Sequence, residues 1–303
     1  MQRLAVSVFA LLGTLLTPAA ALAEEVSFIA FLSPGNEVPP IVDSQLSGVA
    51  QVVIDTTTNK ARFEVYTFDL ASGNALVASH IHRAPEGVNG PVIYPLATTA
   101  FTSPLTGEFD FNPADFSDLS SGGMYVNVHS TNHPSGESRG QLQPGTLTGR
   151  RLTFTLPLSP DNEVPPTDVD AGATALITLD LKMRGDQTVA GATSFNVDYQ
   201  FGTSVTLVGL HVHKGPAGTN GPVVISSGLR PTGDADGRGN ISVKVPLLSA
   251  SGLATFDEIL HDPTGFYVNL HTTANPSGAI RGQLRGGALP RPAGCPPTPQ
   301  PLP

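Results

Sequence analysis

The sequence Ser47-Gly-Val-Ala-Gln-Val-Val-Ile-Asp55, Thr56-Thr-Thr-Asn-Lys60, Ala61-Arg-Phe-Glu-Val-Tyr-Thr-Phe-Asp-Leu70 decides the fold class of this chain. Apolar and polar residues alternate in both outer segments, which is the two-residue period of a half-buried strand. The five residues between them are threonine, asparagine and lysine, a turn-rich composition. The stretch therefore predicts an antiparallel β-hairpin, and an equivalent pair of strands is expected at 173–181 and 193–201.

The hairpin belongs to a module that the chain contains twice. Four motifs recur in the same order in both copies: Pro34–Pro40 and Pro160–Pro166, Asn89–Val92 and Asn220–Val223, Tyr125–His129 and Tyr267–His271, Arg139–Leu142 and Arg281–Leu284. Two copies of this length are typical of independent domains or a packed pair, because solenoids stack three or more short repeats. We therefore expect one domain at 24–148 and a second at 149–289.

Further short strands are expected after the hairpin, separated by turns of glycine, proline and asparagine. In the first copy they are centred on His80, Val92, Phe109, Tyr125 and Arg139. Helix is expected only as a short connector or lid before the tyrosine strand, at 113–119 and 253–260. This pattern predicts an all-β protein made of two tandem antiparallel Greek-key sandwiches or barrels, of the superoxide dismutase-like or immunoglobulin-like type.

The two ends of the chain differ in composition from the repeated part. Residues 1–23 combine Arg3, an apolar stretch and Ala21-Leu-Ala23, which is the pattern of an export signal peptide. Residues 290–303 form a proline-rich tail with the single cysteine, Cys295, so no internal disulfide can form. No later segment has the roughly 18 consecutive apolar residues that cross a bilayer. We expect an exported protein without a membrane anchor, in the periplasm or outside the cell.

Composition narrows the classes of partner and activity. The formal net charge is −9 and lysine and arginine are not clustered, which argues against nucleic acid and an anionic membrane surface as partners. The 32 glycines lie between strands rather than at helix starts, so no phosphate-binding loop or dinucleotide fingerprint is present. No nucleophile elbow or paired-cysteine zinc motif occurs either, so the sequence favours a binding protein over an enzyme.

Six of the eight histidines occupy matching positions in the two copies. Each copy has a His-x-His pair and a third histidine on a later strand: His80, His82 and His129, and His211, His213 and His271. Side chains two residues apart on a strand point to the same face, so each pair can reach one ion if the third strand lies beside it. Three neutral imidazoles suit copper, zinc or nickel better than calcium or magnesium. The sequence therefore predicts one transition-metal site per copy.

Neighbouring polar residues leave two interpretations open. The strand of the third histidine carries two more polar residues on the same face: Tyr125 and Asn127 in the first copy, and Tyr267 and Asn269 in the second. They are expected to surround a metal site, or to complete a hydrogen-bonded seam in which the histidines are structural. Arg139, with its counterpart Arg281, either guides an anion to the site or pairs with a buried carboxylate such as Glu37.

The repeated motifs are similar to those of the CHRD (chordin) domain family. They comprise Asn-Glu-Val-Pro-Pro, His-x-His, Gly-Pro-Val, Tyr-Val-Asn-x-His and Arg-Gly-Gln-Leu, in this order in both copies. The resemblance covers both copies almost end to end. The family is best known from an extracellular antagonist of growth factors. The resemblance therefore implies an extracellular interaction module whose partner is a protein or a glycan.

A second resemblance concerns single strands. Gly209-Leu-His-Val-His213 is similar to the strand that supplies two copper ligands in copper/zinc superoxide dismutases, and Tyr125–His129 to the strand of the third. This resemblance implies copper ligands at the six matching histidines and anion guides at Arg139 and Arg281. The sequence lacks that family's bridging histidine, zinc loop and cysteine pair. It therefore supports a copper-only site at most.

Three functions remain as hypotheses at this stage. The first is a secreted metal-binding protein, with one copper ion per domain favoured over zinc, for sequestration or redox protection. The second is a metal-free module that binds an extracellular protein or glycan, and the third is a copper-only dismutase-like enzyme. We take the first as the leading hypothesis, because the histidine pattern is duplicated and no complete catalytic motif accompanies it.

Overall fold

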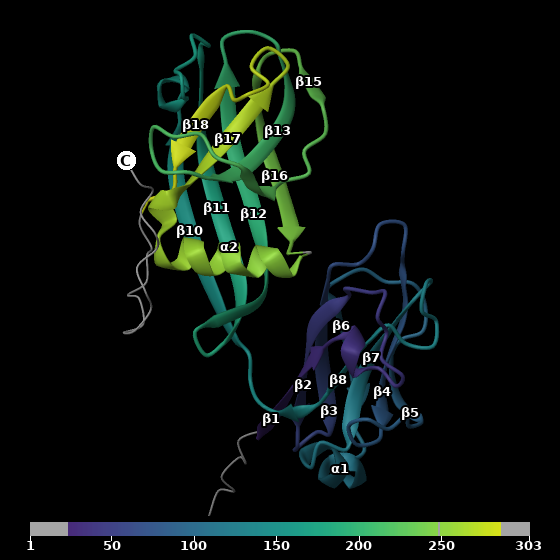
Figure 1. Ribbon diagram of the computed structural model, residues 1–303. Helices are drawn as coiled ribbons and strands as arrows, with labels where there is room; N and C mark the ends of the chain where they lie inside the picture. Colours follow the sequence, from purple (N-terminus) through teal and green to yellow (C-terminus); the bar gives the residue numbers. More distant parts are fainter. Residues whose placement is uncertain (1–23, 248, 286–303) are drawn as a thin grey trace, which may run out of the picture.

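A computed structural model describes residues 24–247 and 249–285 of the chain (Figure 1). The expected signal peptide at 1–23 and the proline-rich tail with Cys295 lie outside the described residues. Within the described part, no helix has the length and apolar character needed to span a membrane.

The first half of the chain folds into two facing antiparallel sheets. The five-stranded sheet has the order β6-β3-β2-β1-β9, and the four-stranded sheet has the order β5-β4-β7-β8. Alternating apolar residues such as Phe28, Val52, Ile81 and Val126 point between the sheets and are almost fully buried. The strands are β1 (Glu25–Leu32), β2 (Ser47–Asp55), β3 (Lys60–Phe68), β4 (Leu76–Arg83), β5 (Val92–Ala97), β6 (Leu105–Asp110), β7 (Met124–Ser130), β8 (Ser138–Gln141) and β9 (Gln143–Pro144).

The second half repeats this sandwich with longer strands. One sheet has the order β10-β11-β12-β16; in the other, β14-β13-β17-β18, the short strand β15 also pairs with β13. Its core includes Phe154, Ile177, Phe195 and Val268. The strands are β10 (Thr148–Leu158), β11 (Ala171–Arg184), β12 (Gln187–Phe201), β13 (Val205–Lys214), β14 (Val223–Ser226), β15 (Thr232–Asp234), β16 (Arg238–Pro246), β17 (Phe266–Thr272) and β18 (Ile280–Gln283).

The predicted all-β sandwich class is confirmed, and the sheets of the described residues do not close into a barrel. The hairpin expected from the opening stretch is formed by β2 and β3, with Ser47 opposite Phe68. Its counterpart, β11 and β12, extends beyond the predicted ranges to a tight turn at Gly185, whose φ of 58° favours glycine. The alternation of buried and exposed residues continues up to that turn, as the burial of Leu179, Leu181 and Met183 in the core shows.

The helices before the tyrosine strands pack on the cores. In the first domain a 3-10 turn, η2 (Pro113–Asp115), leads into α1 (Phe116–Ser120), which buries Leu119. In the second domain α2 (Ala250–His261) is longer than predicted and buries Phe256, Ile259 and Leu260. The other 3-10 turns are η1 (Pro34–Asn36), η3 (Pro160–Asn162) and η4 (Pro263–Gly265). Both α-helices therefore pack on the cores, which agrees with the expected connector and not with the expected lid.

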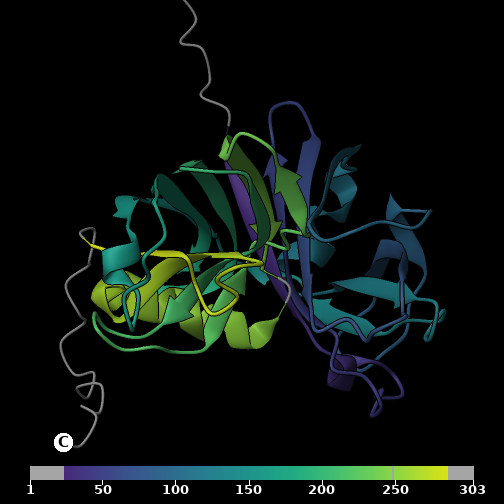
Figure 2. The same ribbon diagram turned by 90° about the horizontal axis from the view of Figure 1, so that it is seen from above.

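The two domains contact each other side by side (Figure 2). A small apolar cluster joins them, with Ile29, Val49 and Phe68 from the first domain packed with Val189 and Ala190 of β12. Polar contacts flank this cluster: the Lys182 ammonium lies 2.6 Å from a Glu64 carboxylate oxygen, and the Ala250 amide at the start of α2 donates to Asp69 at 3.0 Å. The two sandwiches therefore form a docked pair.

Candidate metal centres

The predicted histidines of the first domain lie on two paired strands. In the register of β4 and β7, His82 is opposite Tyr125 and His80 is opposite Asn127. Ile81, between the two histidines, is 2% exposed and points into the sandwich core, so His80 and His82 point away from it. The His-x-His spacing and the strand pairing together gather the polar side chains on the outer face of the sheet.

This outer face is not open to solvent along its length. Every residue of β7 is buried on both faces, because loops cover the polar side. One loop follows η1 and brings in Glu37, a second contains Pro85 and Gly90, and a third contains Pro134. The loops come from the repeated sequence motifs, so the motifs of each copy meet around one polar layer.

The three histidines of each copy converge. His80 Nδ1 lies 3.1 Å from His129 Nε2, and in the second domain His213 Nε2 lies 3.4 Å from His271 Nε2. Within each triad, the potential ligand atoms all lie within 4.8 Å of one another. Nitrogens about 2.1 Å from a common ion are about 3.4 Å apart in tetrahedral geometry. Small ring rotations would therefore complete a three-nitrogen site in either domain.

Main-chain carbonyls fix the tautomers of two histidines in each triad. A carbonyl oxygen can only accept, so the facing Nδ1 must carry the proton and Nε2 must present its lone pair. The four Nδ1 donors and their acceptors are His82 to Gly90 O (2.9 Å), His129 to Pro134 O (3.1 Å), His213 to Gly221 O (2.9 Å) and His271 to Pro276 O (3.1 Å). This is the arrangement that orients metal-ligating histidines in proteins.

The nitrogen atoms of each triad are arranged in a way that fits a bound cation. His213 and His271 face each other through two unprotonated Nε2 atoms 3.4 Å apart, and two lone pairs at this distance repel. In the first domain, His82 Nε2 is buried without a hydrogen-bond partner among the described residues. Both features disfavour a ligand-free interior, and both are satisfied by a cation between the rings.

A proton is poorly suited to be that cation near neutral pH. Burial lowers the pKa of His80, His82 and His129, and the neighbouring rings lower the pKa of His80 further. Burial, with His271 beside it, lowers the pKa of His211 to about 4. The triads are therefore neutral imidazoles at pH 7, which is the form that binds metal ions.

Tyr125 and Arg139 form a stack behind His82. The Tyr125 ring is stacked on the His82 imidazole with centroids 4.8 Å apart, and the Arg139 guanidinium carbon lies 3.4 Å from the Tyr125 centroid. Each group occupies one face of the phenol ring. Tyr125 Oη also accepts from the Gly90 amide at 3.2 Å. The second domain repeats the stack. The Arg281 guanidinium carbon lies 3.4 Å from the Tyr267 centroid, and the Tyr267 and His213 centroids are 4.8 Å apart.

The position of Arg139 distinguishes its two expected roles, which were guiding an anion to the site and pairing with a buried carboxylate. It is 2% exposed, it is separated from His82 by the Tyr125 ring, and it donates to Pro85 O at 3.1 Å. An anion arriving from solvent cannot reach a guanidinium in this position, so the structure disagrees with the anion-guide expectation for Arg139. Arg281 is 1% exposed and makes the same contacts. Both arginines are held by stacking and carbonyl acceptors instead.

Glu37 is the buried carboxylate nearest to this stack. Burial raises the pKa of Glu37 to about 7, while the Arg139 charge and a hydrogen bond from Asn127 oppose the rise in pKa. The Asn127 amide donates to Glu37 Oε2 at 3.4 Å. No direct ion pair joins Glu37 to Arg139 among the described residues, so the predicted pairing is electrostatic and not a contact. Glu163 is the equivalent carboxylate, with Asn269 as its donor.

Sequence reasoning did not identify the carbonyl acceptors, although the motifs contained a signal. Gly90 is at a position where a Cβ would lie 1.9 Å from Arg83 O, and at Gly221 it would lie 1.7 Å from Lys214 O. Only glycine lets the loop approach the strand closely enough for its carbonyl to meet the histidine. The repeated Asn-Gly-Pro motif therefore serves the site through its backbone.

Comparison with known proteins agrees with this repeated architecture. The family model of the CHRD domain matches the chain twice, over residues 28–142 and 154–284. Both matches contain a complete histidine triad and its stacked tyrosine and arginine. No curated protein matches the chain.

Proposed function

The chain belongs to the CHRD domain family with two copies of the domain, and from this premise we propose that each copy binds one transition-metal ion, copper in preference to zinc. The ligands are His80, His82 and His129 in the first domain, and their counterparts are His211, His213 and His271. The protein would sequester the metal or protect against its redox chemistry. The duplicated triad makes two ions per chain the expected stoichiometry.

The observation that carries the proposal is the contact between His213 and His271. Each has its Nδ1 proton committed to a main-chain carbonyl, so two Nε2 lone pairs face each other at 3.4 Å. A purely structural histidine pair would place a donor against an acceptor. Two acceptors facing each other favour a metal ion between His213 and His271. In the first domain His80 Nδ1 can donate to His129 Nε2, so the supporting observation there is His82 Nε2, which has no hydrogen-bond partner among the described residues.

Copper is favoured by the type of ligand and by access. Imidazole ligands suit copper as well as zinc, and copper stands highest in the affinity order of divalent first-row metals. His80 and His211 are only partly buried, while His129 and His271 are 7% exposed. The partly exposed histidine marks the side from which an ion enters and where a fourth ligand can bind.

We also propose that the protein acts outside the cytoplasm. Residues 1–23 have the composition of an export signal. The low charge content and the single cysteine are compatible with an oxidising compartment. Detection of the mature chain in the periplasmic or extracellular fraction would test this part of the proposal.

Metal titration tests the central claim. The mature protein, freed of metal with a chelator, would be titrated with Cu(II), with Cu(I) and with Zn(II), and the bound metal measured by calorimetry and elemental analysis. We expect two copper ions per chain, and one in the variant His80→Ala/His82→Ala. The proposal would be refuted if the protein bound neither Cu(I) nor Cu(II), or if the variant still bound two copper ions.

The two remaining histidines supply a matched control. His133 and His261 lie outside both triads, with His133 3.5 Å from Asp43 and His261 bonded to Asp257 O. The double variant His133→Ala/His261→Ala removes as many imidazoles as the site variant. It should keep both copper ions, so a loss of metal in this control would mean that binding is not specific to the triads.

A further inference from the structure

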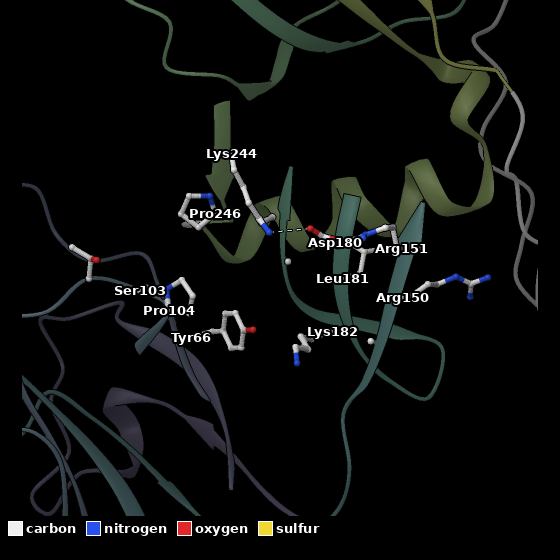
Figure 3. A pocket seen from close by; sticks show the side chains of 14 residues that line it. Tyr66, Ser103, Pro104, Arg150, Arg151, Asp180, Leu181, Lys182, Lys244 and Pro246 are labelled. Carbon is white, nitrogen blue, oxygen red and sulfur yellow. Dashed lines mark hydrogen bonds and ion pairs between the residues drawn. The ribbon is translucent and has the colours of Figure 1, made fainter. Parts of the chain in front are cut away.

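A cleft of about 900 Å³ lies between the two domains, away from both histidine triads (Figure 3). One wall belongs to the first domain and includes Tyr66, Ser103 and Pro104. The other wall is the outer face of the β10-β11-β12-β16 sheet of the second domain. The cleft has the size of a small-molecule site, which falls between about 300 and 1,000 Å³.

The floor of the cleft is a row of residues across this sheet. Arg151 is opposite Asp180, Asp180 is opposite Ala192, and Ala192 is opposite Pro246. These side chains point outward because Leu181, next to Asp180, is buried in the core. Three steps between neighbouring strands make the row about 14 Å long. The floor is therefore long enough for an extended ligand.

The cleft is positively charged in a protein of net charge −9. Three cationic side chains face it, those of Arg151, Lys182 and Lys244, together with one carboxylate, that of Asp180. Asp180 accepts from Arg151 at 2.6 Å and from Lys244 at 2.9 Å, so one negative charge is shared between two cations. When Glu64, the partner of Lys182, is also counted, one positive charge remains. Such a concentration of charge attracts anionic ligands.

The cations are available to a ligand. The side chains of Arg151 and Lys244 are 71% and 58% exposed even with their contacts to Asp180. Figure 3 shows Lys182 and Tyr66 on facing sides of the cleft, with Lys244 and Arg151 along its floor. Arginine forms paired hydrogen bonds with carboxylates, so an anion can replace water here with little rearrangement.

The opposite wall adds features that suit a sugar. Tyr66 supplies a flat aromatic surface with a polar end, and Thr102 and Ser103 supply hydroxyl groups. Pro104 and Pro246 add apolar surface at the two walls. We propose that this cleft binds an acidic oligosaccharide, with uronate carboxylates on the cations and one sugar ring against Tyr66. Because both domains contribute walls, the bound glycan also joins the two domains.

Calorimetric binding of an oligogalacturonate to the intact mature protein tests the inference, with a neutral oligosaccharide of the same length as the comparison. We expect the acidic ligand alone to bind, and to bind at least tenfold more weakly when ionic strength is raised from about 50 mM to about 500 mM. The variant Arg151→Ala/Lys244→Ala should lose at least tenfold in affinity, because both side chains are exposed cations of the floor and their removal leaves the sheet intact. Tyr66→Ala should weaken binding without changing the salt dependence.

The matched control is Arg230→Ala/Arg238→Ala, which removes two exposed charges of the second domain outside the cleft. It should bind as the unmodified protein does. An equal loss in this control, equal binding of the neutral sugar, or displacement by an equal concentration of sulfate would overturn the proposal. The variant His80→Ala/His211→Ala should retain full glycan binding, so the failure of the metal proposal and of this one can be told apart.

Discussion

The Tyr125 ring lies flat on the His82 imidazole, with centroids 4.8 Å apart and planes inclined by 10°. The Arg139 guanidinium covers the other face of the same ring at 3.4 Å. His82 is thus held in its plane by the stack and in its tautomer by Gly90 O. The orientation of this proposed metal ligand is determined by Tyr125, Arg139 and the Gly90 carbonyl, which lie outside the histidine triad.

The first prediction concerns the stacked tyrosine. In a background that lacks the second site, Tyr125→Leu should lower copper affinity about tenfold or more, the range seen when partners that orient metal ligands are removed. Tyr125→Phe keeps the ring and loses only the contact with the Gly90 amide, so it should lose less than about threefold. Competition with a chelator of known affinity measures both. Equal losses in the two variants would mean that stacking is unimportant.

The second prediction distinguishes the roles of Arg139. Replacing the buried guanidinium in Arg139→Lys removes the planar stack on Tyr125 and the bond to Pro85 O, so the free energy of unfolding should fall by about 2 kcal/mol. Urea unfolding measures the change. The exposed Arg62→Lys, whose partner is Glu25, should change it by less than about 0.5 kcal/mol. An unchanged stability in Arg139→Lys would mean that the stack on Tyr125 and the bond to Pro85 O do not stabilise the fold.

Local periodicity accounts for the parts of the fold that the sequence predicts well. Alternation in 47–55 and 61–70 predicts the hairpin because each strand buries one face. The same two-residue period puts His80 and His82 on one face, and strand pairing then brings His129 to them. These features depend on neighbours along one strand, or on one pairing, and a single sequence contains that information.

The remaining features depend on contacts between distant segments. Alternation in β7 suggests one polar, accessible face, yet all seven residues are buried because loops far apart in the sequence cover that face. The burial of Arg139 and the carbonyl acceptors Gly90 O and Pro134 O follow from this covering. The cleft floor needs Arg151, Asp180 and Lys244 to meet across the four strands of one sheet. No local pattern signals such a convergence.

The third prediction tests the backbone acceptor of His82. A Cβ at position 90 would lie 1.9 Å from Arg83 O, so Gly90→Ala must displace the loop and its carbonyl. We expect a loss of stability of about 2 kcal/mol or more and at least tenfold weaker copper binding at the first site. The control Gly35→Ala meets only Ser33 Oγ at 3.6 Å and should bind copper normally. If Gly90→Ala kept full affinity, the carbonyl would not be needed to orient His82.

The last prediction concerns the pH dependence of stability in the metal-free protein. The pKa of Glu37 is about 7 in the folded state, against 4.5 for an unburied glutamate. Below pH 4.5 the carboxyl is protonated in both the folded and the unfolded state, so its burial does not lower the free energy of unfolding. Between these two values the folded state holds a proton that the unfolded state has released. The contribution of Glu37 to the free energy of unfolding therefore falls as pH rises through this window, and stays low above pH 7.

Glu37→Gln keeps the shape of the side chain and removes the titration. The difference in free energy of unfolding, variant minus unmodified protein, should increase by about 1 to 2 kcal/mol from about pH 4.5 to about pH 7.5. Urea unfolding with a chelator present measures both free energies. The buried histidines titrate in both proteins, so their contribution cancels in the difference. Glu86→Gln, at an exposed position, should show no such trend. A flat difference for Glu37→Gln would mean that Arg139 and Asn127 offset the effect of burial, leaving Glu37 ionised within the fold.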